Sequence, residues 1–211
     1  MSNFKLSAKE AFSFGWSVFK ANAFYLVVLF AGIGVIYFGL AAFQDFADSR
    51  GSALVILLGL VDWIFRLSIS IGLIEIPLLL ASGQKPDFGH LFSGYRYILR
   101  YFLASVLYML AVVGGLLLLV VPGIIFAMRL QFYGYLIIDK GMKPMQSLKE
   151  SWRMTEGVTM DLFGFILLTM LLNIAGAMAF MLGLLITAPV SLLALTYVYK
   201  KLLTRNQTVI A

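Results

Sequence analysis

Six apolar runs divide the chain, and polar or turn-forming residues bound each of them. The runs cover roughly residues 23–43, 53–81, 101–121, 122–138, 162–180 and 184–199. An α-helix rises about 1.5 Å per residue, so a hydrocarbon layer of about 30 Å requires about 20 residues. The run 53–81 is longer and must tilt or project beyond the layer, whereas 122–138 and 184–199 are short. The pattern predicts six transmembrane helices.

Uncharged turns join neighbouring runs into pairs. Pro122-Gly123 divides one long apolar stretch and Gly183 divides another, and each turn predicts a tight hairpin of antiparallel helices. A single kinked, over-long helix is the alternative in both places. Ala175, Ala179 and Gly183 repeat every four positions, and such a stripe of small residues predicts close helix packing. The chain is thus expected to fold as three hairpins.

An amphipathic segment precedes each predicted hairpin. These segments cover about residues 7–20, 87–98 and 144–157. Ser7 and Glu10 form an S-x-x-E capping box at the start of the first helix, and Asp87 is placed to cap the second. Pro144 suits the first turn of the third helix, and Gly157 suits its C-terminal stop. We therefore expect three interfacial helices that lie in the headgroup plane.

Tryptophan marks two of these helices as interfacial anchors, Trp16 in the first and Trp152 in the third. In the third helix, Met145, Leu148 and Trp152 form an apolar face opposite charged side chains. Two interpretations stay open. The helices either anchor and space the hairpins, or they recognise lipid headgroups or a partner protein.

Composition makes this an integral membrane protein and excludes several kinds of site. Of the 211 residues, 62% are apolar and only 12% are charged, about half the charged fraction of a soluble domain. We treat residues 1–211 as one membrane domain. The chain has no cysteine, which excludes disulfides and thiol chemistry, and its single histidine, His90, cannot build a metal site alone. No cofactor is expected.

The positions of the basic residues predict the orientation in the membrane. Thirteen of the 16 Lys and Arg residues lie in the N-terminal segment, the loops 82–100 and 139–161, and the C-terminal tail. The opposite side carries only Arg50. By the positive-inside rule, both termini are cytoplasmic. This distribution explains the net charge of +6 without a nucleic-acid partner.

Three stretches carry a resemblance to a known family: "VPGIIFAMR", "IIDKGMKPMQSLKESWRMTEG" and "GLLITAPVSLLALTYVYKKL". Between about residues 70 and 203 the chain resembles a bacterial group of uncharacterised six-helix membrane proteins. That group is related to the membrane domain of some glycerophosphodiester phosphodiesterases. The matching residues are Pro122, Gly123, Arg129, Ser151, Trp152, Thr155, Gly157, Pro189 and Tyr199. The resemblance implies the fold and a bacterial inner-membrane location. It implies no catalytic residue, because the catalytic domain is absent here.

Four ionisable residues lie within the predicted spans: Asp62, Arg66, Glu75 and Arg129. An arginine at bilayer depth costs roughly 2.5 to 17 kcal/mol unless water, headgroups or a partner offset it. Counted along their helices, Arg66 and Arg129 both fall near the midplane. Asp62 and Arg66 can pair at i, i+4. We treat the four residues as a charge cluster, balanced in sign.

Arg129 then needs a polar partner from elsewhere, and Glu75, Gln131 and Asn173 are the candidates. Three interpretations of the cluster stay open: an ion-pair network that fixes helix register, a site for an anionic headgroup, or a proton or cation path. The sequence shows no pair of broken helices, which argues against a known secondary-transporter fold.

A non-enzymatic protein that binds or handles a lipid or small amphiphile within the membrane is the function we expect. The chain shows no nucleophile with a base and no metal set. An accessory or regulatory subunit of a membrane complex is the first alternative, and a small-solute transporter is the second. The expected partners are membrane lipid and either a partner protein or a second copy of the chain.

Overall fold

The computed structural model describes residues 6–48, 52–91, 93–179 and 182–210, with side chains omitted for 42–58 and 207–210. Within these ranges all regular structure is helical. The helices are α1 (Ala8–Ala21), α2 (Ala23–Asp48), α3 (Ser52–Leu80), η1 (Phe88–Leu91), η2 (Ser93–Tyr97), α4 (Ile98–Leu118), α5 (Val120–Leu130), α6 (Tyr133–Lys140), α7 (Pro144–Met154), α8 (Thr159–Met178) and α9 (Leu184–Ile210). Arg50 and Phe180, the predicted end of the fifth run, lie outside the described residues.

The all-helical class is confirmed, and several helices are long and apolar enough to cross a membrane. In the described part of the chain, five stretches meet that standard: Ala23–Ala41, Gly59–Leu80, Phe88–Leu118, Val120–Lys140 and Thr159–Met178. Helix α9 is also long, at 27 residues, but it is not among the five. Its prediction as a sixth span therefore stays a prediction.

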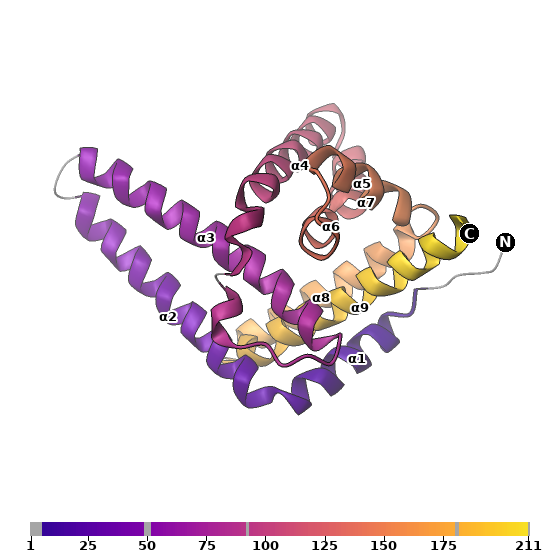
Figure 1. Cartoon of the computed structure of the whole chain (residues 1–211), viewed down its shortest axis with the longest axis horizontal. Coiled ribbons are helices and arrows are strands. Elements are labelled where there is room, and N and C mark those ends of the chain that lie inside the picture. The colour runs from indigo at the N-terminus through magenta and orange to yellow at the C-terminus, as the bar shows by residue number, and fades with distance from the viewer. Residues whose placement is uncertain (1–5, 49–51, 92, 180–181, 211) are drawn as a thin grey trace.

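Helices α1, α8 and α9 pack together, while the α2–α3 hairpin extends away from them (Figure 1). Gly15 allows α1 to approach α9 closely, since a Cβ atom there would lie 2.6 Å from the carbonyl oxygen of Val190. Ser7 caps the start of α1 as predicted, because its Oγ accepts a hydrogen bond from the Glu10 amide over 3.3 Å. The reciprocal half of the capping box is not formed, since the Glu10 carboxylate contacts α9 instead. The Glu10 carboxylate contacts Lys201 Nζ on α9 at 2.6 Å. Helix α1 is thus attached to α9 along its length.

The turn between α4 and α5 lies at Leu119, three residues before the predicted Pro122-Gly123 turn. Leu119 has extended backbone angles, φ −164° and ψ 150°. Pro122 falls in the first turn of α5. Backbone amides in the first turn have no acceptor within the helix, so proline loses no hydrogen bond there. Gly123 lies inside α5 and allows it to approach α4 closely, since a Cβ atom there would come within 2.8 Å of the Leu116 amide nitrogen. Helices α4 and α5 pack against each other, but the predicted position of the turn between them was wrong.

The predicted interfacial α-helix at 87–98 was also wrong. The segment forms two short 3-10 helices, η1 and η2, and the α-helical conformation starts at Ile98. Gly89 and Gly94 lower its helical propensity. The segment lies against α3, since a Cβ atom at Gly72 would meet Leu91 Cα at 2.6 Å and one at Gly94 would meet Ile71. Asp87 precedes η1, and its Oδ1 lies 2.8 Å from His90 Nδ1.

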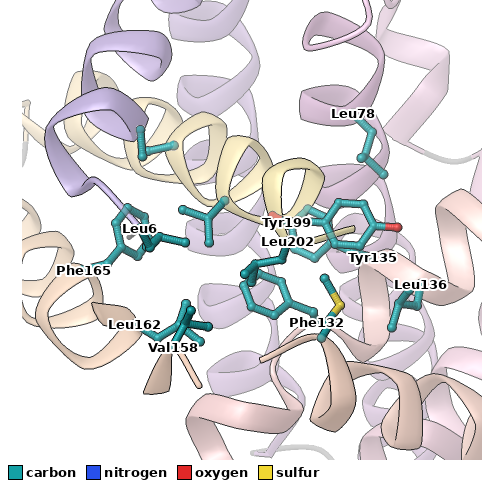
Figure 2. Close-up of a cluster of buried hydrophobic side chains, with 14 of the residues drawn as sticks. Leu6, Leu78, Phe132, Tyr135, Leu136, Val158, Leu162, Phe165, Tyr199 and Leu202 are labelled. Atoms are coloured by element: carbon teal, nitrogen blue, oxygen red, sulfur yellow. The ribbon is translucent and has the colours of Figure 1, made fainter. Parts of the chain in front are cut away.

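The largest buried cluster in the described part of the chain joins α6, α8 and α9 with residues of α1, α3 and α7 (Figure 2). Phe132 and Tyr199 are fully buried in it, with ring centroids 6.2 Å apart, and Tyr135 packs on Tyr199 at 5.0 Å. The Tyr199 hydroxyl donates to Asp139 Oδ2 over 2.8 Å, which satisfies its polar atom. Leu202 is fully buried too. It lies beyond the predicted end of the helix at residue 199, and α9 continues to Ile210.

Candidate functional site

The predicted fourth helix, 122–138, is broken. Helix α5 ends at Leu130 and α6 begins at Tyr133, so the single-helix prediction was wrong. The break releases two backbone groups from helical pairing, the carbonyl of Arg129 and the amide of Phe132. Neither glycine nor proline occurs at the break, which explains why the sequence pattern did not reveal it. Phe132 directs a fully buried ring into the core (Figure 2).

Helix α7 supplies the partners for both released groups. Ser151 Oγ donates to the Arg129 carbonyl over 2.8 Å and accepts from the Phe132 amide over 3.2 Å. Thr155 Oγ1 also lies 3.3 Å from the same carbonyl. Ser151 and Thr155 are fully buried. A serine hydroxyl is both a donor and an acceptor, so one side chain bridges the two sides of the break.

The Arg129 side chain is bound to α7 rather than to another charge. Its Nη2 donates to the Trp152 carbonyl over 3.0 Å, and its guanidinium lies 3.7 Å from the centre of the Trp152 ring. Helix α7 ends at Met154, so the guanidinium faces the negative end of the helix dipole. The expected partners Glu75, Gln131 and Asn173 make no hydrogen bond to it within the described residues.

The face of α7 that is buried in the protein carries serines as well as apolar residues. Met145 is 55% exposed, whereas Ser147, Leu148, Ser151 and Met154 are buried. The polar serines face inward because they satisfy backbone groups, which an apolar-pattern argument cannot detect. The other predicted anchor, Trp16, is 46% exposed and stacks on Phe19.

The four charged residues do not gather into one cluster. Asp62 and Arg66 form the expected local pair, with Arg66 Nε 2.7 Å from Asp62 Oδ2, and the guanidinium lies 4.7 Å from the Tyr37 ring centre. Glu75 accepts a hydrogen bond from Ser93 Oγ over 2.7 Å. Arg129 lies on α5 and contacts α7, so the four residues occupy three separate places.

A cleft of about 500 Å³ runs between α8 and α9. Ten residues line it: Gln131, Phe165, Ile166, Thr169, Asn173, Leu184, Ala188, Ser191, Leu192 and Leu195. Six of these are apolar, four are uncharged polar residues and none is charged. Gln131 reaches the cleft from the break, while its Nε2 donates to the Met128 carbonyl over 2.9 Å. Gln131 and Asn173, expected beside Arg129, line this cleft instead.

Small residues bring α8 and α9 together beyond the cleft, but they are not the predicted stripe. A Cβ atom at Gly183 would lie 2.5 Å from the Gly176 carbonyl oxygen, and one at Gly176 would meet Thr187 Oγ1. Ala175 and Ala179 are exposed. The prediction that Gly183 allows close helix packing is therefore confirmed, and the residue it packs against is Gly176.

The polar groups that sequence reasoning missed are Ser151, Thr155 and Ser191. The first two belong to the motif residues quoted for the family resemblance, so that motif was a usable signal. No local sequence pattern marked Ser191, because its hydrogen-bonding partner Asn173 lies 18 residues away in the chain. In the described ranges, no three His, Asp or Glu side chains gather where they could hold a metal ion.

These features define a class, an all-helical membrane-type protein with a broken helix held by a short amphipathic helix and a cleft in its last hairpin. The chain belongs to the family described as a domain of unknown function (DUF7847), whose model matches residues 88–210. The match runs from η1 to the end of α9, so it includes the break, α7 and the cleft. No curated protein and no solved structure matched the chain.

Proposed function

We propose that this protein binds a lipid or small amphiphile within the membrane, in the cleft between α8 and α9. The supporting observation is the lining of the cleft, which is apolar along most of its length and carries four uncharged polar side chains. A mostly apolar cleft of a few hundred Å³ with a few polar groups is the usual form of a small-molecule site.

The proposed role is non-enzymatic. Ser191 is the only lining residue with a primary hydroxyl, and no histidine, lysine or carboxylate lines the cleft to activate it. Asn173, its hydrogen-bonding neighbour, is not a base. The cleft therefore has the groups to orient a ligand and lacks those that would transform it.

The proposed setting is a bacterial inner membrane with both termini in the cytoplasm and α9 as a sixth span. The distribution of Lys and Arg supports this orientation. We also keep, as a proposal, the relationship to the membrane domain of glycerophosphodiester phosphodiesterases. The alternatives of an accessory subunit and a small-solute transporter make different predictions, namely a fixed protein partner and a solute flux in liposomes.

Native mass spectrometry of the purified protein tests the proposed function. Ala188→Phe places a large ring in the cleft, and Ala175→Phe adds the same ring at an exposed position on α8. We expect wild type and Ala175→Phe to retain a bound amphiphile and Ala188→Phe to lose it. Circular dichroism and gel filtration report whether each variant folds, and Ala188→Leu provides a milder version. Equal ligand retention by folded Ala188→Phe would refute the proposal.

A further inference from the structure

Asn173 and Ser191 form a hydrogen-bonded pair in the wall of the cleft. Asn173 Nδ2 donates to the Thr169 carbonyl over 2.9 Å and to Ser191 Oγ over 3.0 Å. The Thr169 carbonyl can only accept a hydrogen bond, so the amide nitrogen must face it, and the orientation of the Asn173 amide is fixed. The amide oxygen then points away from both partners.

This arrangement leaves hydrogen-bonding capacity without a protein partner. Asn173 Oδ1 is buried and meets no donor within the described residues. Thr187 Oγ1, one turn before Ser191 on α9, is also buried without a partner there. Ser191 Oγ accepts from Asn173, so its own proton is available to an acceptor. Buried polar groups in native proteins are normally paired, so each of these exceptions calls for an explanation.

The charge of the cleft restricts what the partner can be. None of the ten lining residues is charged. Arg129, two positions before Gln131, directs its guanidinium to α7. An anionic headgroup in the cleft would lose its hydration without gaining a cation, which is strongly unfavourable. An anionic ligand is therefore disfavoured in this cleft.

We propose that the cleft selects an uncharged amphiphile that carries a hydroxyl group, such as a fatty alcohol or a monoacylglycerol. Asn173 Oδ1 is closed to solvent, so binding moves the side chains around it. The ligand hydroxyl then donates to Asn173 Oδ1 and accepts from the Ser191 hydroxyl, while its chain lies against Phe165, Leu192 and Leu195. A hydroxyl both donates and accepts, so it matches the available pair. This inference rests on the proposed function and adds the class of ligand and the two residues that select it.

Three probes with the same hydrocarbon chain test this selection: oleyl alcohol, the corresponding alkene and oleyl sulfate. Binding to delipidated protein is measured by native mass spectrometry and by competition. We expect wild type to bind the alcohol about tenfold more tightly than either other probe, the ratio that one net hydrogen bond supplies. In Asn173→Leu the alcohol and the alkene should bind equally. Ser191→Ala should reduce the preference, whereas Ser68→Ala, which removes a hydroxyl from α3, should leave it unchanged.

The outcomes separate the two proposals. Equal or tighter binding of the sulfate, or no preference for the alcohol over the alkene in wild type, overturns the inference about the hydroxyl. So does an unchanged preference in folded Asn173→Leu. If Ala188→Phe nevertheless abolishes binding of all three probes, the cleft remains a lipid site and only the ligand class is wrong. If no probe binds to wild type, the proposed function itself fails.

Discussion

The hydroxyl of Ser151 donates a hydrogen bond to the backbone carbonyl of Arg129 over 2.8 Å. Through this contact, α7 holds the end of α5 at the point where the helix breaks. The same hydroxyl accepts from the Phe132 amide, on the other side of the break. The position of Gln131, which lies between these two residues and lines the cleft, therefore depends on α7.

Replacing Ser151 with alanine should destabilise the protein by about 1–3 kcal/mol. The substitution leaves the Phe132 amide without an acceptor, and only Thr155, at 3.3 Å, still reaches the Arg129 carbonyl. The free energy of unfolding can be measured by denaturant titration in detergent. Ser68→Ala is the control, since Ser68 donates only to Ile64 of its own helix, and it should change stability by less than about 0.5 kcal/mol. Equal effects of the two substitutions would contradict the bridging role of Ser151.

Arg129 and Trp152 should be energetically coupled. The guanidinium lies 3.7 Å from the ring centre, a distance at which a cation–π contact contributes about 0.5–2 kcal/mol. A double-mutant cycle with Arg129→Met and Trp152→Leu should give a coupling energy in that range. The same cycle with Trp16→Leu should give about zero, because Trp16 stacks on Phe19 of α1. A coupling near zero for the Trp152 cycle would show that the contact carries no stability.

The contact between Gly176 and Gly183 should tolerate no added methyl group. Gly176→Ala would place a Cβ atom on the Thr187 hydroxyl and 3.2 Å from the Gly183 carbonyl carbon, and we expect a loss of about 1–3 kcal/mol. Gly164 provides a matched control on α8, since a Cβ atom there meets nothing within 4 Å. Gly164→Ala should be neutral or slightly stabilising. Thermal unfolding of both variants measures the difference, and similar melting temperatures would argue against close packing at Gly176.

The all-helical class, the start of α1 and the Asp62–Arg66 pair could be predicted from the sequence because their signals are local. Long apolar runs indicate helices, Ser7 indicates a helix start, and Asp62 and Arg66 are one helical turn apart. The break at Gln131 could not be predicted this way. Neither glycine nor proline marks the break, and the groups that stabilise it come from Ser151 and Thr155, about 20 residues further along the chain. The partner of Arg129 in α7 could not be predicted for the same reason, and its depth in the membrane stays a prediction.

Acid should weaken the attachment of α1 to α9. The hydrogen bond and charge of Lys201 hold the pKa of Glu10 below its ordinary value of 4.5. A lowered pKa in the folded state means that the contact stabilises the protein fully above pH 4.5. This stabilisation is lost as the pH falls through the lower value. Glu10→Gln should therefore have a lower melting temperature than wild type at neutral pH, and this difference should disappear at acid pH.

Glu156→Gln is the control for this pH dependence, because its carboxylate makes none of the ion pairs in the described residues. The difference in melting temperature between wild type and Glu156→Gln should not change as the pH is lowered. A gap between wild type and Glu10→Gln that persists unchanged at acid pH would mean that the Glu10 charge is not what attaches α1.

The cleft was the feature least accessible from sequence. Asn173 and Ser191 each occur in an apolar helix, where a single polar residue has many possible roles. Their pairing became visible only when Gly176 and Gly183 set the distance between α8 and α9. The sequence therefore predicted the hairpin and could not predict the space within it.

Photo-crosslinking with an oleyl alcohol that carries a diazirine on its chain tests the central claim most directly. After illumination of the protein in lipid nanodiscs, mass spectrometry of peptides locates the attached probe. We predict that labelling concentrates on lining residues of α8 and α9, such as Ile166 and Leu192, and that excess unlabelled oleyl alcohol suppresses it. Labelling confined to exposed surfaces such as Leu110 and Leu117 of α4, with no competition, would show that lipid only surrounds the protein and would contradict the account.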